Sequence, residues 1–474
     1  MNSEEPSSHL APMPLSLLRR NLRYCSYDAL VGTPFCFLLQ PGNFIIAALM
    51  VSVFKLTPAV YGLISALPFL ANFAQVFLMP LISRSYSAKT ISVTMVTLQA
   101  LCWLTMAALM PLLPIDNPEI SGKWWIALFL ISAVLNSMAG VSWISWIREW
   151  VPQRLLGKYF GLRNRLAQFS QISFLLITGW LINQLSNSIL AFQFILVVSC
   201  LLRLVSGWYQ WKTTTETSIH SHPRTSLNWR DQLAVLLQTK PCLWFIAYSA
   251  AWGFAASLFS PFTSIFMYEE LNLSVQQVST IVIVASIGGA VSATAWGKLA
   301  DRFGNKPVML FCMILWQAQN FLWCIVTPAN HWILYPMWVF GGVMGAGFTL
   351  SLFNLQLKII PAQAKTLAIS VNIAVASLLT AVGPILGGKI LEWALSGNTP
   401  AIDVYHRVFF FTPILSLLAC LLLIRVRESS ASPLSSVVGA MRNIRTLSSI
   451  FGASFLADYM FIKTQKRPNP GSLR

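Results

Sequence analysis

The chain has 474 residues, of which 56% are hydrophobic and only 10% are charged. An ordinary soluble domain carries about 25% charged residues, so this composition excludes a soluble fold and indicates that lipid is the solvent. The net charge of +17 would suit nucleic acid, but the basic residues are scattered in short clusters between apolar runs, which argues against a nucleic-acid-binding surface.

Uncharged stretches of about 20 residues mark the membrane-spanning helices, because charge is costly in hydrocarbon. Eight such stretches hold one helix each. Two longer stretches, from Arg165 to Arg203 and from Lys306 to Lys358, hold a pair each. The apolar runs are too continuous for the alternating strands of a barrel. The sequence therefore predicts an all-α membrane protein with twelve transmembrane helices in two six-helix halves.

The predicted segments follow one another with a long polar stretch between the halves. They are an amino-terminal tail at 1–27, a half at 28–211, a linker at 212–240, a second half at 241–425 and a carboxyl-terminal tail at 426–474. All but four of the 32 Lys and Arg residues fall on one side of the predicted spans. Because the basic side is normally cytoplasmic, we expect both termini in the cytoplasm and the protein in the plasma membrane, specifically a bacterial inner membrane.

The most specific motif lies between the eighth and ninth predicted helices. Residues 297–306 read Gly-Lys-Leu-Ala-Asp-Arg-Phe-Gly-Asn-Lys. This segment closely resembles the loop motif of the major facilitator superfamily and departs from it only at Asn305. A weaker first-half copy at 80–89 has Arg84 where the motif has Asp. The resemblance implies that family's fold and a transport function.

The resemblance also implies that loop residues on the basic side control conformational change. In the 297–306 loop and its first-half copy, the candidates are Gly297, Asp301, Arg302, Gly304, Lys306 and Arg84. After the fourth helix, Glu149 could form a charge network with Arg154 and Arg163 that exchanges partners as the conformation changes. The alternative is that these loops only set topology and packing.

In the fold that the resemblance implies, the first, fourth, seventh and tenth helices line a central cavity between the halves. The first helix is interrupted at mid-depth by Gln40-Pro41-Gly42-Asn43, and such a break needs protein or cavity water to satisfy its backbone. The candidate substrate-binding residues are Gln40, Asn43, Asn136, Trp143, Tyr248, Trp252, Asn354 and Asn372. The alternative for each one is an interhelical hydrogen bond or packing contact.

No Asp, Glu, Lys or Arg is predicted at the centre of a span, so the coupling ion is not visible in the sequence. Coupling to protons would have to use carboxylates at helix ends, namely Asp28, Glu269, Glu270 and Glu392. A cavity without charge favours a neutral or amphipathic organic solute, because buried charge requires a partner.

Two further stretches allow two interpretations each. On the eleventh helix, residues 383–388 read Gly-Pro-Ile-Leu-Gly-Gly and resemble an antiporter motif, or they allow a close helix contact. After the twelfth helix, apolar residues at helical spacing from Val437 to Phe455 predict an interfacial helix, and the alternative is a weakly ordered tail.

The sequence therefore predicts a secondary active transporter that works by alternating access, with protons as one option for coupling. A drug or metabolite efflux antiporter is the nearest alternative, and a polytopic membrane enzyme or a non-transporting sensor are more distant ones. We expect no catalytic residue, cofactor or metal, since the eight cysteines and five histidines form no convergent site. The expected partners are a small-molecule substrate, protons and membrane lipid, and the expected state is a monomer.

Overall fold

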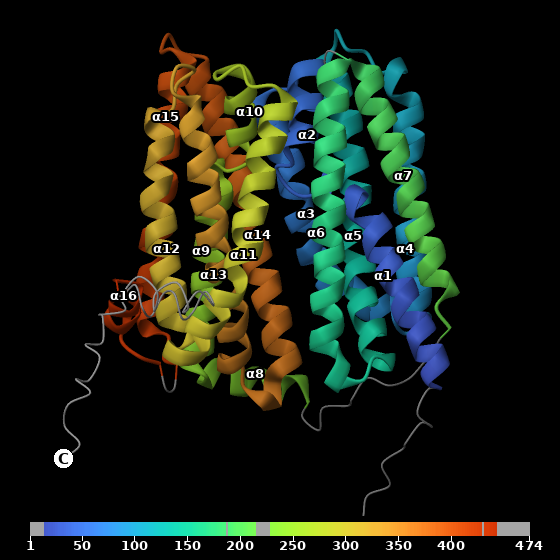
Figure 1. Ribbon diagram of the computed structural model, residues 1–474, viewed down its shortest axis with the longest axis vertical. Coiled ribbons are helices and arrows are strands. Elements are labelled where there is room, and N and C mark those ends of the chain that lie inside the picture. Colours follow the sequence, from blue (N-terminus) through green and yellow to red (C-terminus); the bar gives the residue numbers. More distant parts are fainter. Residues whose placement is uncertain (1–13, 186–187, 215–227, 429–430, 443–474) are drawn as a thin grey trace, which may run out of the picture.

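The computed structural model of the protein describes residues 14–185, 188–214, 228–428 and 431–442, without the side chains at 153, 154, 156–158 and 362. Every regular element in these ranges is a helix (Figure 1). Eleven of the described helices are long and apolar enough to cross a membrane. One further segment is interrupted within its length, and with it the predicted twelve helices in two halves are confirmed.

The first half contains six segments. They are α1 (Leu15–Leu38) with α2 (Phe44–Ala48) and the π-helical turn η1 (Leu49–Val53), α3 (Pro58–Ile82), α4 (Ala88–Leu109), α5 (Pro118–Trp150), α6 (Gln153–Gln184) and α7 (Ile189–Lys212). Side chains cap several starts: Ser87 accepts a hydrogen bond from the Thr90 amide, and Asn117 accepts one from the Ile120 amide. Such caps satisfy amides that have no partner inside the helix.

The second half repeats this arrangement after the short helix α8 (Trp229–Gln238). Its segments are α9 (Lys240–Phe259) with α10 (Phe262–Glu269), α11 (Val275–Phe303), α12 (Asn305–Asn320), α13 (Leu334–Ile359), α14 (Lys365–Leu395) and α15 (Ala401–Cys420). Short 3-10 turns extend several of these helices, and α16 (Leu434–Arg442) follows the last.

The first segment of each half is interrupted at a corresponding place. Between α1 and α2, Gly42 has φ +68°, a conformation that residues with a side chain rarely adopt. Between α9 and α10, the break falls at Ser260 and Pro261. A Cβ on Gly42 would lie against Pro261, so the two breaks touch. The tips beyond them are also joined, because the Tyr268 hydroxyl donates to the Phe44 carbonyl at 3.1 Å.

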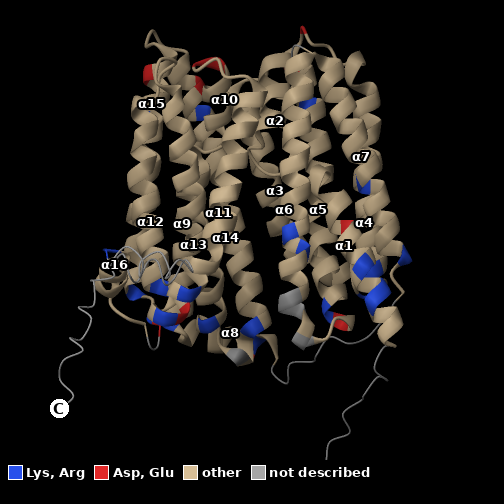
Figure 2. Ribbon diagram, in the orientation of Figure 1, with Lys and Arg blue, Asp and Glu red and all other residues tan. Residues whose placement is uncertain are grey.

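The charged side chains are concentrated at one end of the bundle. Figure 2 shows Lys and Arg gathered at the lower end, which we call the basic end, and few charges at the opposite, outer end. This distribution agrees with the asymmetry that the sequence predicts for the loops.

The halves are closed against each other at the outer end. Helix α3 packs along α14, and α6 packs along α11. A Cβ on Gly62 would overlap the Pro384 carbonyl, and one on Gly388 would overlap the Pro58 carbonyl, so the two backbones are in direct contact. The amide of Ala59 adds a hydrogen bond to Glu392 Oε2 at 3.1 Å. The small residues of 383–388 therefore allow a close helix contact in this conformation.

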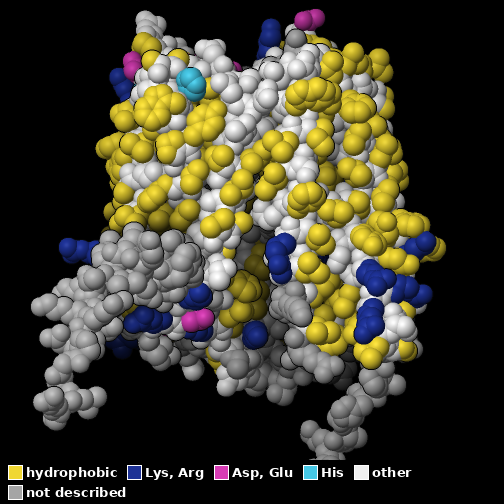
Figure 3. Space-filling model, viewed as in Figure 1, with side chains coloured by type: hydrophobic (Ala, Val, Ile, Leu, Met, Phe, Trp, Pro, Cys, Tyr) yellow, Lys and Arg dark blue, Asp and Glu magenta, His cyan; other side chains and the backbone are white. Residues whose placement is uncertain are grey.

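Toward the basic end the two halves separate. The space-filling view shows a hollow between them at this end (Figure 3). Together with the contacts at the outer end, this hollow defines a conformation that is open toward the basic end alone.

The carboxyl-terminal helix α16 contacts α12 and α11 at the basic end. Its Val437 side chain is completely buried and Met441 packs against the same apolar cluster, so this side of the helix faces the bundle. The remaining apolar positions of the predicted interfacial helix, Ile444, Leu447, Phe451 and Phe455, lie outside the described residues.

Candidate functional site

One face of α5 opens into the hollow. Phe129 and Ala133, two turns and one turn before Asn136 on that face, are buried, whereas Asn136 is exposed. One turn further along, a Cβ on Gly140 would have no neighbour within 4 Å. Polar residues within a membrane usually face the bundle interior or a water-filled cavity and not lipid. We therefore infer that Asn136 and Gly140 border the hollow.

A guanidinium stacks on an aromatic ring beside this open stretch. The Arg163 guanidinium of α6 lies 4.1 Å from the centre of the Trp143 ring of α5. The Phe160 ring meets Trp143 edge-on, with 6.1 Å between centroids. Cation–π stacking of this kind is stronger where water is partly excluded, and the Arg163 side chain is only 22% exposed. Arg163 and Trp143 thus form one polar and aromatic surface one turn from Gly140.

Behind this surface lies a buried carboxylate. The Asp28 side chain is 2% exposed, and its Oδ1 accepts hydrogen bonds from Ser206 Oγ at 2.7 Å and Gln210 Nε2 at 2.9 Å. Its Oδ2 lies 3.4 Å from Arg163 Nη2. A buried carboxylate requires such partners, because the desolvation cost of its charge is large.

A second cation lies on the far side of the carboxylate. Arg203 of α7 is 7% exposed, and its Nη1 lies 3.4 Å from the Ser206 hydroxyl that donates to Asp28. The Nε atoms of both Arg163 and Arg203 are buried without a hydrogen-bond partner. The carboxylate therefore pairs directly with Arg163 and is linked to Arg203 through the Ser206 hydroxyl, in the interior of the first half.

The helices extend beyond the charges that the sequence used as span boundaries. Helix α1 begins at Leu15, thirteen residues before Asp28, so Asp28 lies well within the helix. Arg203 lies nine residues before the end of α7 at Lys212. The sequence indicated Asp28 only as a helix-end carboxylate and missed Arg203, Ser206 and Gln210, because nothing local shows that they meet.

The two candidate amide side chains at the break in the first segment, Asn43 and Gln40, differ in their hydrogen bonds. Asn43 caps α2: its Oδ1 accepts from the amides of Ile45 at 3.0 Å and Ile46 at 3.3 Å, and its Nδ2 donates to the Phe37 carbonyl at 2.8 Å. Both ends of this amide are occupied by backbone. The Gln40 side chain is exposed and remains a candidate for binding substrate.

Several other candidates hold a polar atom that has no partner. Trp143 Nε1, Trp252 Nε1, Tyr248 Oη and Asn372 Oδ1 are all buried without a hydrogen bond in the structure. Buried polar groups are normally paired, so such atoms are free to meet water or a ligand. Trp252 also stacks on Phe348, with 4.7 Å between centroids, whereas Tyr248 is fully buried in an apolar cluster. Asn354 is partly exposed on α13.

The loop residues are arranged around the end of α11. Gly304 ends this helix with φ +96°, where a side chain would be strained. Asp301 is exposed, and Arg302 lies over the Phe303 ring at 5.2 Å. Gly297 faces open space near Leu350. The Lys306 amine donates to the Val426 carbonyl at 2.8 Å, which ties this loop to the segment after α15.

The loop candidates of the first half do not gather around one helix end. Arg84 and Glu149 are exposed, and the Arg154 side chain lies outside the described residues. The predicted Glu149 network includes Arg163, whose ion-pair partner in this conformation is Asp28. The exchange of partners between conformations stays a prediction.

The loop after α11 is held by a residue that the sequence did not indicate. Glu428 Oε1 accepts from the Asn305 amide at 3.1 Å, and Oε2 accepts from the Lys306 amide at 2.8 Å. Lys358 at the end of α13 adds a salt bridge to Oε1 at 3.1 Å. A carboxylate is favoured at this position, because the first turn of α12 presents free amides and a partial positive charge.

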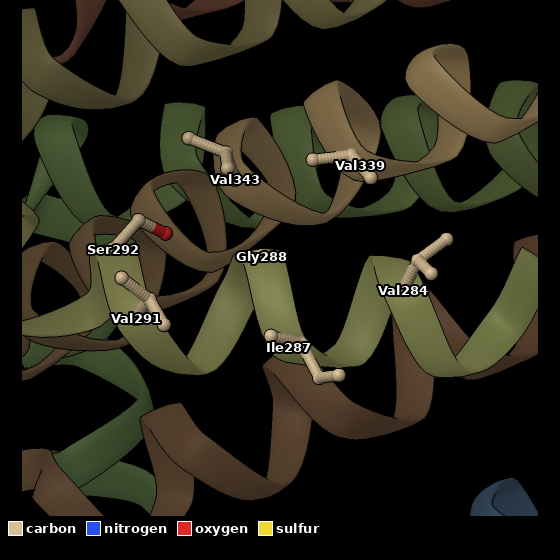
Figure 4. A pocket seen from close by; sticks show the side chains of 7 residues that line it. All are labelled: Val284, Ile287, Gly288, Val291, Ser292, Val339 and Val343. Atoms are coloured by element: carbon tan, nitrogen blue, oxygen red, sulfur yellow. The ribbon is translucent and has the colours of Figure 1, made fainter.

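An apolar groove between α11 and α13 offers no comparable chemistry. It has a volume of about 440 Å³ and is lined mainly by valines, Ile287 and Gly288 (Figure 4). Its one polar side chain, Ser292, donates back to the Gly289 carbonyl at 3.1 Å. Among the described residues no group of three or more His, Cys, Asp or Glu could hold a metal ion. The candidate site is therefore the hollow.

Comparison with known proteins identifies the family. The model of the Major Facilitator Superfamily matches residues 33–266 and again residues 244–462, one match for each half. The protein belongs to the major facilitator superfamily, a class of multi-pass membrane transporters.

Sequence relatives match only part of this chain. It is 28% identical over 172 residues to the multi-drug resistance efflux pump PmrA of Streptococcus pneumoniae. This alignment covers 35% of this chain and 40% of that protein. It is 23% identical over 186 residues to azole resistance protein 1 of Saccharomyces cerevisiae, covering 36% and 30%. The aligned region thus spans less than half the length of either relative.

Solved structures match nearly the whole fold. The nucleoside transporter NupG superposes with a TM-score of 0.67 at 16% identity, covering 86% of this chain and all of that one. A D-xylose-proton symporter gives a TM-score of 0.67 at 12% identity, covering 88% and 100%. A bacterial homologue of the iron transporter ferroportin in its inward-facing state gives 0.61 at 12% identity, covering 87% and 98%. At these identities the likeness concerns the fold alone.

Proposed function

We propose that the protein is a secondary active transporter that moves a small neutral or amphipathic organic solute across the membrane by alternating access. The observation that carries the proposal is the hollow between the halves. It opens toward the basic end and is closed at the outer end by the contact of Gly62 with α14. We infer that the exposed Asn136 and Gly140 border it. A cavity that reaches one side of the membrane at a time is what alternating access requires.

Filling the hollow tests this proposal. Gly140→Trp places a large side chain where the structure leaves open space, so it should abolish transport and leave folding intact. Gly439→Trp is the matched control, because Gly439 on α16 also has nothing within 4 Å but lies away from the hollow. Substrates are first selected by thermal-shift screening of sugars, nucleosides and drugs, since a bound ligand raises the melting temperature. Exchange in proteoliposomes is then measured, and equal exchange by both variants would refute the role of the hollow.

Proton coupling forms a second part of the proposal, with Asp28 as the proton carrier. The Asp28 side chain is buried among the helices of the first half, whereas Glu428, whose side chain is equally buried, holds the loop after α11. The groups that face it are Cys25 on α1, Tyr159 and Arg163 on α6, and Arg203 on α7. Protonation would release Arg163 and alter the link between α1 and α6.

The test of Asp28 distinguishes proton coupling from the movement of the solute itself. In proteoliposomes, Asp28→Asn should lose accumulation driven by a pH gradient and keep exchange at equal pH on both sides. Asp116→Asn, an exposed change at the outer end, is the control. Accumulation that persists in the Asp28 variant would assign coupling elsewhere.

The direction of transport that we favour is export. This part of the proposal is supported by the names of the two sequence relatives, an efflux pump and a resistance protein. We also propose that the basic end is cytoplasmic, in accordance with the usual placement of Lys and Arg. In this orientation the hollow receives its solute from the cytoplasm. Drug sensitivity of cells with and without the protein measures the direction, and a higher internal drug level in producing cells would indicate import.

A further inference from the structure

The charges beside the hollow do not balance. Asp28 pairs with Arg163 and is linked to Arg203 only through Ser206. In the described part of the chain Arg163 has no second carboxylate within ion-pair distance, and Arg203 has none. An excess cation in the interior is costly unless an anion or water compensates it. The arrangement thus has room for one more negative group.

The two arginines are not equivalent in position. Arg203 contacts Asp28 through Ser206 from the α7 side, and a Cβ on Gly32 would lie 3.1 Å from its Nη1, so it is enclosed between α1 and α7. Arg163 lies against Trp143, on the α5 face that borders the hollow, and is 22% exposed. A solute in the hollow can therefore reach Arg163, whereas Arg203 stays behind Asp28.

Of the links that the Asp28 carboxylate makes, the one to Arg163 is the longest. The hydrogen bonds from Ser206 and Gln210 to Asp28 Oδ1 measure 2.7 and 2.9 Å, whereas Arg163 Nη2 is 3.4 Å from Oδ2. Charge-assisted bonds are usually about 2.7–2.9 Å long. Asp28 remains hydrogen-bonded to α7 if Arg163 moves away. Arg163 can thus change partner without leaving Asp28 unpaired.

The surroundings of Arg163 suit a molecule with a flat apolar body. Its Nε and the Nε1 of Trp143 are both buried without an acceptor, so two donors have no partner in this conformation. Open space at Gly140 adjoins the Trp143 ring, and Asn136 follows on the same face. A planar acid could place its ring in this space and its oxygens toward Arg163.

We propose that the hollow binds an amphipathic organic anion, whose carboxylate or equivalent group pairs with Arg163 while its apolar body lies along Trp143 and Gly140. This inference rests on the proposed transport function and narrows its substrate class. It assigns Arg163 to substrate recognition, with Asp28 competing for the same guanidinium.

Three probes of one shape and different charge test the assignment. They are naphthoate, naphthalenemethanol and naphthylmethylammonium, each added to the purified full-length protein in neutral detergent. Naphthoate should raise the melting temperature, and the alcohol and the ammonium should not. This comparison needs no variant, so it is decisive even if a substitution impairs folding. Equal stabilisation by the alcohol, or stabilisation by the ammonium alone, would overturn the proposal.

Two substitutions should shift naphthoate binding in opposite directions. Arg163→Gln should weaken it by about tenfold or more, since the charge-assisted hydrogen bonds to the carboxylate are lost. Arg165→Gln is the matched control, because Arg165 is exposed on the same helix and its Nε donates to the carbonyl of Gly161 one turn earlier. Asp28→Asn should strengthen binding, because the competing carboxylate is gone. A purely structural role for Arg163 predicts no gain from Asp28→Asn, so the absence of that gain would count against recognition.

Exchange in proteoliposomes separates this inference from the transport function. If naphthoate exchanges and its exchange depends on Arg163, both stand. If naphthalenemethanol exchanges and naphthoate does not, the protein is a transporter but the anion assignment is wrong. If naphthoate binds through Arg163 and no probe crosses the membrane, the anion site stands and the transport function is refuted.

Discussion

At the level of single residues, the break in the first segment gives a clear prediction. Asn43 caps α2 through both ends of its amide, so Asn43→Ala should lower the free energy of unfolding by about 1–2 kcal/mol, the usual effect of losing a cap. Gln40→Ala, at an exposed side chain in the same break, should leave stability unchanged. Melting temperatures of the purified variants decide this, and equal losses in both would mean that the cap is not the reason.

The same two variants also test substrate binding, which the sequence predicts for both side-chain amides. With its amide fully used by backbone, Asn43 should affect affinity only through folding. Gln40 is free to bind solute, so Gln40→Ala should weaken binding by about 1 kcal/mol. Affinity measured on the folded fraction checks this, and a direct affinity loss in Asn43→Ala alone would reverse the assignment.

Glu428 should make stability depend on pH. Burial raises the pKa of this carboxyl, but hydrogen bonds from Lys306 and Asn305 and the amine of Lys358 outweigh it, so the pKa lies below its ordinary value of 4.5. A lowered pKa in the folded state means stabilisation that is present above pH 4.5 and lost as the pH falls through the folded value.

The corresponding variant is Glu428→Gln. It should lower the free energy of unfolding by about 1–2 kcal/mol at neutral pH, because a neutral acceptor forms weaker bonds than a carboxylate. The difference from the parent protein should shrink below pH 4.5. Unfolding curves at several pH values measure it, and a difference that is constant with pH would exclude the charge as its cause.

Among the elements, α16 shows which part of the tail the bundle holds. Val437 is completely buried against the α12 side and its neighbour Val438 is 39% exposed. Val437→Ala should therefore cost about 1–2 kcal/mol of stability, and Val438→Ala much less. Protease cleavage of the tail provides the measurement, with faster cleavage expected only for the first variant. Similar cleavage of both would indicate that α16 is not anchored through Val437.

Most of the helices could be predicted from the sequence, because hydrocarbon imposes length and apolarity on every crossing. The same rule misplaced the start of α1. It treats each charge as a boundary, yet Asp28 is tolerated inside the helix because Ser206, Gln210 and Arg163 from two other helices neutralise it. Partners that are about 135 to 182 positions away in sequence leave no local trace.

The candidate site was predictable only in part for a related reason. Polar and aromatic residues on the fourth helix could be selected by type and depth, and in the structure Asn136 is exposed on that helix. Whether an amide is free or used by backbone depends on local geometry, as Asn43 shows. The role of Glu428 was not predictable, since it arises from a loop contact between distant segments.

On the scale of the whole molecule, the conformation predicts sided access. A cysteine introduced as Gly140→Cys should react with a membrane-impermeant maleimide added at the basic end and not at the outer end, because the hollow opens only one way. Asp116→Cys, in an exposed outer loop, should show the reverse. Labelling in inside-out and right-side-out vesicles measures this above the background of the parent protein. Labelling of both positions from one side would contradict the arrangement.

The closed outer end should be sensitive to side-chain size. Gly62→Leu puts bulk where the α3 backbone meets Pro384 and Gly388, so it should disfavour the conformation that is open at the basic end. The expected result is reduced labelling of Gly140→Cys from the basic end and increased labelling from the outer end. Gly439→Leu, at a position without close neighbours, is the control. Unchanged labelling in Gly62→Leu would mean that this contact does not hold the outer end closed.

The contact of Glu428 with the start of α12 also constrains the order of biosynthesis. Asn305 leaves the ribosome 123 residues before the carboxylate that caps it. At about 5–20 residues per second, the amides of Asn305 and Lys306 wait roughly 6–25 seconds for their partner. The connection between α11 and α12 therefore matures only after the last membrane helix has been made. A nascent chain that stalls within α15 would present this connection uncapped, and membrane proteases could distinguish it from the finished protein.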